Sequence, residues 1–448
     1  MSEIHARRAS PGGAPLNFGV RSPIPRPKGT PQRNEMQDLQ DIIFTDTHKE
    51  VRAKAHEIAR KYLLPQAAKH DRDHSYNEDA MSAAAEMGLL GTWIAPEYGG
   101  TGVGILGLAL VVEEFSKADP SFGVAFAVNA LGSIPVIMGG TEEQKQKYLP
   151  GVARGEISCA FALSEKFAGS DAGGLSVKAD KVDGGWVING EKKWTTNGSR
   201  ADLITCFAVT DPESRSRRIS AFLVEKDDPG FAIKKLEDKM GIRMVPVAET
   251  EYKNCHVGDD RLLGGKPGLG FKHSMMTLDW ARPGVAAQGV GTAAGALELA
   301  TTYATRRKQF GQPIAGFQMI QSMLADMAQQ TEAARWLVYM CAAQADAGIS
   351  VNKTAAMAKC FATDTAMKVA TEAVQVFGGY GFMEDYPIAK FMRDAKILQI
   401  YEGTNQVQRM VIARNLVKEA STHDYLGEFI PQEHQETFTE QELVTANT

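Results

Sequence analysis

The spacing of hydrophobic and polar residues divides the chain into a helical part, a β part and a second helical part. In the first part, apolar residues recur every three or four positions over 77–90 and 106–117, which predicts amphipathic helices. From about residue 157, β-branched and aromatic runs cut by turn dipeptides predict a β domain. Beyond residue 271 the helical spacing returns, as over 320–338.

Local signals refine this division. Thr47 and Glu50 have the spacing of a capping box, which predicts that the first folded helix opens there. A second box, 141–144, predicts a short helix that ends before Pro150. Asp183-Gly184 and Asn189-Gly190 are hairpin turn signals on either side of a short strand over 186–188.

The expected fold class is therefore mainly α with a central antiparallel β domain. The predicted segments are a flexible arm (1–35), a helical domain (36–155), the β domain (156–265), a helical domain (266–420) and a tail (421–448). The arm is rich in Arg but broken by six prolines, which favours a solvated arm over an amphipathic transit helix.

Charge and cysteine content exclude several classes of protein. A formal net charge of −5 gives no field suited to nucleic acid, so no nucleic-acid partner is predicted. Five cysteines without a C-x-x-C pair favour a reducing compartment. We find no run of about 18 apolar residues and no secretory signal, so we predict no membrane span. A cytoplasmic location is expected, with the mitochondrial matrix as the less favoured alternative.

Familiar cofactor motifs are weak or missing. Residues 102–107 match the letters of the dinucleotide fingerprint G-x-G-x-x-G, but no βαβ pattern surrounds them, so we predict a loop leading into a helix. The sequence contains no H-E-x-x-H, P-loop or metal-spaced carboxylate cluster, and no metal is predicted.

Six other segments carry most of the information. They are 161–171, 193–198, 278–283, 307–311, 375–379 and 400–406, the last reading Ile-Tyr-Glu-Gly-Thr-Asn-Gln. In this order and at these separations the chain closely resembles the acyl-CoA dehydrogenases over roughly residues 40–418. The resemblance implies an N-terminal helical domain, a middle antiparallel β-barrel domain and a C-terminal four-helix bundle, with FAD as cofactor.

The implied reaction is α,β-dehydrogenation of an acyl-CoA thioester to the 2-enoyl-CoA. It needs a carboxylate base at Cα, donors at the thioester carbonyl and a flavin N5 that takes the β-hydride. Glu402 stands where the family has its base, and enclosure by an acyl chain and a flavin is expected to raise its pKa. Some members place the base just before the arginine of Asp-x-x-Arg, but that position is Ala281 here. Outside this motif a lone loop Glu would be interpreted as solvated.

The resemblance also implies residues on the substrate side. Arg282 is expected near the base and Asp279 near the CoA moiety, although the two could form an ordinary helix ion pair instead. The full expected set is Ser170, Asp279, Arg282, Tyr401 and Gly403.

A larger set is expected to bind the flavin. Residues from the β domain are Phe161, Leu163, Ser164, Gly169, Ser170, Trp194, Thr195 and Thr196, and those beside the base are Thr404 and Gln406. Residues that in the family reach the flavin across a subunit boundary are Arg307, Phe310, Gln318, Gln375, Val376, Gly378 and Gly379, which implies an oligomer, usually a tetramer. Trp194 could instead be plain core. Lys166-Phe167 replaces the family's usual Pro-Gly, so the turn there is expected to differ.

Substrate and partners are less defined. Gly123 occupies the place where glutaryl-CoA members carry an arginine, so a dicarboxylyl group is disfavoured, and the chain length of the acyl group cannot be deduced. Electron-transferring flavoprotein is the expected electron acceptor. An oxidase or an enoyl-CoA reductase using the same site stays open, as do a non-catalytic CoA- or flavin-binding subunit and a helical scaffold without cofactor.

Overall fold

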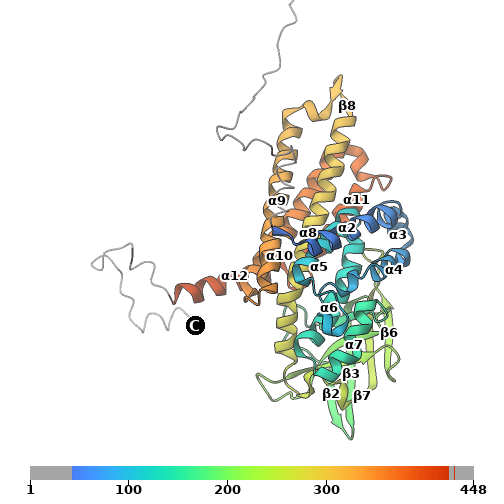
Figure 1. Ribbon diagram of the computed structural model, residues 1–448, viewed down its shortest axis with the longest axis vertical. Coiled ribbons are helices and arrows are strands. Elements are labelled where there is room, and N and C mark those ends of the chain that lie inside the picture. Colours follow the sequence, from blue (N-terminus) through green and yellow to red (C-terminus); the bar gives the residue numbers. More distant parts are fainter. Residues whose placement is uncertain (1–42, 423–427, 429–448) are drawn as a thin grey trace, which may run out of the picture. The chain divides into compact units, whose positions relative to one another are not determined.

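The first helical part packs around two long buried helices, α5 (Gly104–Ala118) and α6 (Pro120–Gly139) (Figure 1). The computed structural model describes residues 43–422 and 428, so the predicted arm and most of the tail lie outside the described residues. The helices of this part are α2 (Asp46–Ile58), η1 (Ala59–Leu63), α3 (Ala67–Asp73), α4 (Glu78–Glu86), η2 (Leu89–Gly91), η3 (Pro96–Tyr98), α5 (Gly104–Ala118), α6 (Pro120–Gly139) and α7 (Glu142–Arg154).

The two capping boxes had different outcomes. Thr141 caps α7 in a full capping box with Gln144, as predicted, but α7 continues through Pro150 and ends at Arg154. The first box is wrong, because α2 begins at Asp46 and Thr47 is already helical. Composition alone places helix ends only to within one or two residues.

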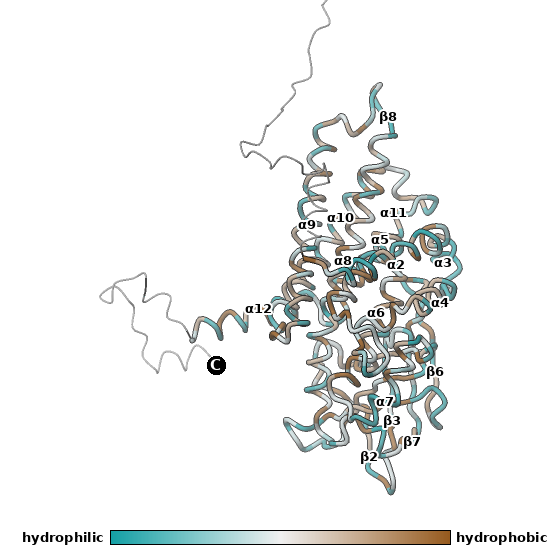
Figure 2. The backbone as a smooth tube through the Cα atoms, in the orientation of Figure 1, coloured by the Kyte–Doolittle hydropathy of each residue, from teal (hydrophilic) through white to brown (hydrophobic). Residues whose placement is uncertain are grey.

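The α6 helix corrects the expectation that no long apolar run exists. Its length and composition would allow it to cross a membrane, but 72% of its most apolar 18-residue window is buried inside the protein, as in the core helix of a globular fold. It packs on α5, α8 and β1. Gly132 makes the close approach to β1 possible, because a Cβ there would lie 2.6 Å from Cβ of Cys159. In Figure 2, by contrast, the tube of α3 is coloured mostly hydrophilic.

The central part is a curled sheet. Its strands are β1 (Cys159–Ala162), β2 (Lys178–Val182), β3 (Gly185–Thr196), β4 (Leu203–Val209), β5 (Ile219–Glu225), β6 (Phe231–Leu236) and β7 (Val247–Gly258). The strand order is β1-β4-β2-β3-β7-β6, with β5 paired to β4. Most pairings are antiparallel as predicted, but β4 pairs in parallel with β1 and β2.

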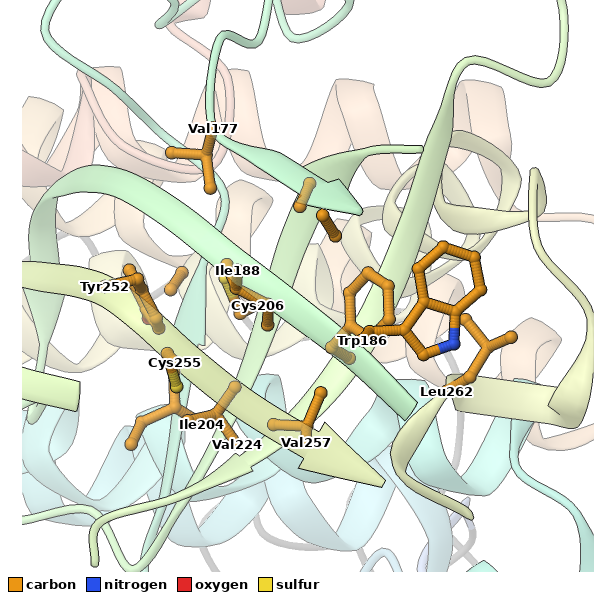
Figure 3. Packing of buried hydrophobic residues seen from close by; sticks show 14 of the residues in the cluster. Val177, Trp186, Ile188, Ile204, Cys206, Val224, Tyr252, Cys255, Val257 and Leu262 are labelled. Atoms are coloured by element: carbon orange, nitrogen blue, oxygen red, sulfur yellow. The ribbon is translucent and has the colours of Figure 1, made fainter. Parts of the chain in front are cut away.

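The sheet encloses its own apolar core. Figure 3 shows side chains from several strands meeting there, among them Trp186, Ile188, Cys206, Tyr252 and Val257. Burial of this much apolar surface is the main force that holds a curled sheet closed. All five cysteines of the chain are buried and free.

The second predicted hairpin turn is wrong. Asn189-Gly190 lies inside β3, where the register with β7 shifts between Ile188 and Gly190. Gly190 has a φ of 136°, and the Asn189 side chain accepts a hydrogen bond from Asn254 N at 2.8 Å. The chain therefore uses the positive φ of Gly190 for a bulge and not for a reversal.

The C-terminal part is a bundle of long helices. It contains α8 (Gly270–Arg306), β8 (Lys308–Gln309), β9 (Gln312–Pro313), α9 (Gln318–Asp346), α10 (Asn352–Phe377), η7 (Gly378–Phe382), α11 (Ile388–Leu398) and α12 (Asn405–Ala420). The helices α8, α9, α10 and α11 share one apolar core, much of it alanine from α8 and α10. Small side chains allow the helix axes to approach closely, which rigidifies the elements that carry the site described below.

The G-x-G-x-x-G letters at 102–107 lead into a helix, as predicted. The N-terminus of α5 does meet an anion, but that anion is the Asp346 carboxylate at the end of α9, which accepts hydrogen bonds from Ile105 N (2.6 Å) and Leu106 N (2.9 Å). A helix N-terminus attracts negative charge, and here an internal carboxylate satisfies it. The segment is a structural joint between two parts of the fold.

Candidate active site

The predicted base, Glu402, lies in the turn that joins α11 to α12. Glu402 and Gly403 both have left-handed backbone, with φ of 53° and 88°. The Asn405 N–H closes the turn by donating to Gln399 O at 3.0 Å. A non-glycine residue at positive φ is uncommon and persists only where its surroundings hold it. The contacts around this turn therefore decide where the carboxylate points.

Three side chains hold the turn through its carbonyl groups. Arg282 Nε donates to Glu402 O at 3.4 Å. Gln408 Nε2 donates to Glu402 O at 3.3 Å and to Gly403 O at 2.9 Å. Lys359 Nζ donates to Gly403 O at 2.9 Å. The backbone of the base is thus fixed from α8, α10 and α12 together.

The carboxylate itself is poised to take up a proton. Its Oε2 is buried and has no hydrogen-bond partner among the residues that the structure describes. Burial raises the pKa of Glu402 from 4.5 to about 7, although the positive charges of Arg282 and Lys359 oppose this rise. A general base works best when its pKa lies near the working pH, and an unpaired oxygen is free to accept a substrate proton.

The raised pKa of Glu402 predicts a pH-dependent difference in stability between the native chain and Glu402→Gln. Between about pH 4.5 and 7 the folded state binds the Glu402 proton more tightly than the unfolded state does, so stability falls as pH rises through this window. Glutamine has no such loss. We expect the variant to gain relative stability from pH 5 to pH 8, up to about 3 kcal/mol, measured by thermal unfolding.

The control for this measurement is Glu213→Gln, which removes a carboxylate from an exposed loop; a gain as large in this variant would mean that the effect is not specific to Glu402. If the difference in stability between Glu402→Gln and the native chain does not change with pH, the Glu402 carboxyl has an ordinary pKa.

Arg282 and Asp279 form the helix ion pair that the sequence left open. Arg282 Nη1 lies 2.7 Å from Asp279 Oδ1, and Asn352 Nδ2 donates to the same carboxylate. Burial raises the pKa of Asp279, with Asn352 and Arg282 opposing. The Tyr401 hydroxyl donates a hydrogen bond to Gln288 Oε1. The pair orients the guanidinium that contacts the Glu402 main chain.

Sequence reasoning missed Lys359 and Asn405. Lys359 is completely buried, and its Nζ also donates to Asn405 Oδ1 at 2.8 Å. A signal was present, because Lys359 falls at helical spacing on a face of α10 otherwise formed by small residues such as Ala355, Ala362 and Thr363. A lysine on a buried stripe requires a reason.

The segment predicted to line the flavin is anchored by a buried ion pair. Glu165 accepts hydrogen bonds from Ser176 N (2.7 Å) and Val177 N (3.1 Å), and it pairs with Lys192 at 2.8 Å. Lys192 also donates to Leu163 O at 3.0 Å. These contacts tie the loop after β1 to β3 and leave Gly169 and Ser170 exposed.

Nearby residues of this segment differ in their surroundings. Phe161 packs on Phe207 with ring centroids 4.9 Å apart, and Ser164 O accepts from Lys193 N at 2.9 Å. Lys166 lies over the Phe167 ring at 5.2 Å, and Phe167 is 89% exposed. The two residues that replace the family's usual Pro-Gly therefore project outward as a pair.

Trp194 is not plain core. It has a φ of 55°, sits in the irregular stretch of β3 between Lys192 and Thr195, and is 55% exposed. Thr195 Oγ1 beside it is buried without a hydrogen-bond partner among the described residues. A bulge of this kind redirects a side chain out of a sheet. An exposed indole next to an orphan hydroxyl is suited to hold a planar, polar-edged ligand.

The residues predicted to act across a subunit boundary gather elsewhere. Arg307 stacks over Tyr380 at 5.4 Å, and Phe310 is 94% exposed with a φ of 48°. Figure 1 shows the β8 hairpin at the opposite end of the long helices from the sheet. The further members of this group are Gln318, Gln375, Gly378 and Gly379, which are exposed, and Val376, which is buried in the bundle core. A single chain therefore does not bring both groups together.

The two predicted flavin residues that follow Glu402 in the sequence, Thr404 and Gln406, both lie at the start of α12. Thr404 is the N-cap of α12, where its hydroxyl accepts from Val407 N at 3.2 Å, and Gln406 is exposed in the first turn.

Three family models match almost all of the described chain. They are the acyl-CoA dehydrogenase N-terminal domain over 45–156, the middle domain over 160–255 and the C-terminal domain over 268–417. The chain belongs to the acyl-CoA dehydrogenase family. The predicted family, fold class and oxidoreductase class are thereby confirmed.

Curated members of the family match over nearly their whole length. The probable acyl-CoA dehydrogenase FadE25 of Mycobacterium tuberculosis is 45% identical over 375 residues, which is 83% of this chain and 96% of the relative. The acryloyl-CoA reductase (NADH) of Anaerotignum propionicum is 41% identical over 388 residues, 86% of this chain and 98% of the relative.

Solved structures of the family have the same fold. Butyryl-CoA dehydrogenase of Megasphaera elsdenii has a TM-score of 0.82 at 42% identity, covering 84% of this chain and 99% of that one. A chain from work on the electron transferring flavoprotein of Acidaminococcus fermentans has a TM-score of 0.82 at 45% identity with the same coverage. An acyl-CoA dehydrogenase of Bacillus anthracis, complexed with FAD, has a TM-score of 0.79 at 33% identity, covering 85% and 68%.

Proposed function

We propose that this acyl-CoA dehydrogenase removes the α-proton of an acyl-CoA thioester with Glu402, as the β-hydride leaves to FAD. The observation that carries the proposal is the Glu402 carboxylate, whose Oε2 is buried and unpaired among the described residues and whose pKa burial raises to about 7. A non-catalytic subunit would have no need of such a group. Among the described parts of the chain, this is the carboxylate that best suits a general base.

The chain's own residues prepare the proton transfer. Oε2 is the atom that takes the proton, since Arg282, Lys359 and Gln408 contact the main chain of the turn and leave that oxygen open. The charges of Arg282 and Lys359 keep the pKa from rising beyond the neutral range, so the base is partly ionised at pH 7. The family's expected oxyanion donor is the Glu402 N–H.

FAD is the cofactor of this family, and the residues present fit it. Trp194 is exposed, the buried Thr195 hydroxyl has no partner among the described residues, and Lys192 clamps the loop after β1 through Glu165; these features fit a flavin ring. Gly169 has open space around it, so backbone there can approach a pyrophosphate. When bound, FAD supplies the two-electron acceptor for the hydride. We therefore expect the purified protein with bound FAD to be yellow.

The second group of flavin residues supports an oligomer, with a tetramer expected. Phe310, Met319 and Phe382 are each at least 78% exposed at the end of the bundle that carries Arg307. Large exposed apolar side chains near glycines with open surroundings, Gly378 and Gly379, suit a surface that meets another subunit and its flavin. Each complete site would then need two chains.

The substrate is proposed to be an uncharged acyl-CoA. Gly123 lies against Ser116, and a Cβ there would fall 1.9 Å from Ser116 Oγ, so the arginine that would meet a distal carboxylate has no room without movement of that side chain. The butyryl- and acryloyl-CoA relatives support testing short chains first. Electron-transferring flavoprotein is the proposed acceptor, and a cytoplasmic location is proposed from the bacterial relatives.

Reduction of an enoyl-CoA is the second candidate, favoured by the acryloyl-CoA reductase relative. The same base and flavin surface could serve both directions, because the redox potentials of the partners set the direction. An oxidase would use oxygen as acceptor.

The test is spectroscopic. The purified protein should show a flavin spectrum, and anaerobic addition of a saturated acyl-CoA from a panel of C3 to C12 and branched thioesters should bleach it. Turnover with a one-electron acceptor, with oxygen or with NADH and an enoyl-CoA then separates dehydrogenase, oxidase and reductase. A colourless protein that FAD does not reconstitute would disprove the proposal, as would a flavin that no acyl-CoA reduces and no enoyl-CoA reoxidises.

A further inference from the structure

Lys359 stands on the buried face of α10 with no exposed surface. An ammonium group removed from water loses hydration, which is costly unless other contacts compensate. An apolar residue of similar size would fill the same place between helices without this cost. The groups next to the buried Lys359 ammonium should therefore show why a charge is present there.

The partners of Lys359 are neutral and belong to the segment of the base. Its Nζ donates to Gly403 O at 2.9 Å and to Asn405 Oδ1 at 2.8 Å. Within 43–422 no carboxylate lies at salt-bridge distance from Nζ, in contrast to the buried lysines Lys192 and Lys390. The positive charge is thus left to act on its surroundings.

Asn405 is itself held in place. Its Nδ2 donates to Thr363 Oγ1 at 2.9 Å and to Asp364 Oδ1 at 2.7 Å. This network gives the Lys359 ammonium one orientation, toward the carbonyl that follows Glu402. Movement of Lys359 would remove one of the two side-chain donors to the Gly403 carbonyl and leave Gln408 as the other.

The charged groups around this site come from three helices. Glu402 raises the pKa of Lys359, Arg282 lowers it, and burial, the largest effect, brings it to about 8. Asp364 contributes a negative charge but pairs with Arg409 at 2.6 Å, and Asp279 pairs with Arg282. Arg282 acts on the pKa of Glu402 more strongly than Lys359 does, but Arg282 is paired with Asp279, whereas Lys359 has no carboxylate at salt-bridge distance within 43–422.

We propose that Lys359 is a positioning residue for Glu402: it fixes the Gly403 carbonyl, which keeps the left-handed turn, and it supplies a positive charge that favours the ionised base. The proposal rests on the proposed function, since it takes Glu402 as the base. It adds a residue from α10 that does not touch the reacting atoms.

The experiment compares Lys359→Met with Lys359→Gln, which keeps a hydrogen-bond donor without the charge. The matched control is Lys368→Met on the exposed face of the same helix. Two quantities are measured on the FAD-loaded protein. One is the pH dependence of the acyl-CoA bleaching rate. The other is an infrared titration of the Glu402 carboxyl, identified by the band that Glu402→Gln removes, which requires no turnover.

Removal of the charge should shift both titrations upward by about one pH unit, because a nearby positive charge favours a carboxylate. The Gln variant should keep more of the plateau rate than the Met variant, and Lys368→Met should match the native chain. If the Glu402 carboxyl titrates at the same pH in both Lys359 variants as in the native protein, the proposal is wrong. If both Lys359 variants can be recovered only as unfolded protein, the proposal is also wrong, because Lys359 would then be needed for folding.

Failure of this inference is distinct from failure of the proposed function. If the native protein is not bleached by any thioester, or if Glu402→Gln bleaches normally, the assignment of the base is wrong. If the native protein behaves as proposed and the Lys359 variants alone show no shift, only the positioning role is wrong.

Discussion

Glu402→Gln should slow the bleaching of the flavin by acyl-CoA about 10²–10⁴-fold, the usual contribution of a positioned general base. The substitution keeps the size and planarity of the side chain but removes the oxygen that accepts the α-proton. The buried Oε2 has no other partner among the described residues, so no existing network needs to break. Stopped-flow absorbance under anaerobic conditions measures the rate.

Three further measurements make this result specific. The variant should still contain FAD and bind acyl-CoA, because Trp194, the clamped loop and the bundle are unaltered. Glu402→Asp, which keeps a carboxylate but withdraws it by one methylene, should retain more activity than the Gln variant. Exchange of the α-proton with deuterated water should disappear in the Gln variant. Bleaching at the native rate would show that another group is the base.

The second large effect concerns the joint between the two helical parts of the fold. Lys390 on α11 is almost fully buried and contacts three acceptors: Asp119, Ser121 Oγ at 3.0 Å and Asp394 Oδ2 at 2.6 Å. Burial lowers the pKa of Lys390, but the two carboxylates more than offset this, so its pKa is raised. Burial raises the pKa of Asp119 in turn.

Lys390→Met should lower the free energy of unfolding by about 3–5 kcal/mol, because it leaves two buried carboxylates without their cation. Denaturant unfolding of the FAD-loaded protein measures the change. The matched control, Lys234→Met, breaks an exposed pair with Glu191 and should change the free energy of unfolding far less.

A second substitution tests the cause. Asp119→Asn in the Lys390→Met background removes one of the stranded charges, so it should recover part of the loss. A loss in Lys390→Met no larger than in the control, or no recovery in the double variant, would mean that the cluster is not an ionic joint.

Local sequence signals succeeded where one neighbour along the chain decides the structure. The Thr141 to Gln144 box formed as expected, since both partners lie on one helical turn. Asn189-Gly190 was wrongly predicted as a hairpin turn, because whether a glycine at positive φ makes a turn or a bulge depends on the strand that pairs with it. The apolar α6 was overlooked since burial, and not composition, distinguishes a core helix from other apolar runs.

The sequence by itself determined the order of helical, β and helical parts, the family and the segment that carries Glu402, because these depend on spacing and residue type along the chain. Only the tertiary structure decided the chemistry of that carboxylate. Its pKa near 7 comes from burial by other elements, and the charges that restrain it come from α8 and α10, 120 and 43 positions away in sequence. Desolvation and Coulomb interactions act through space, so spacing along a chain cannot reveal them.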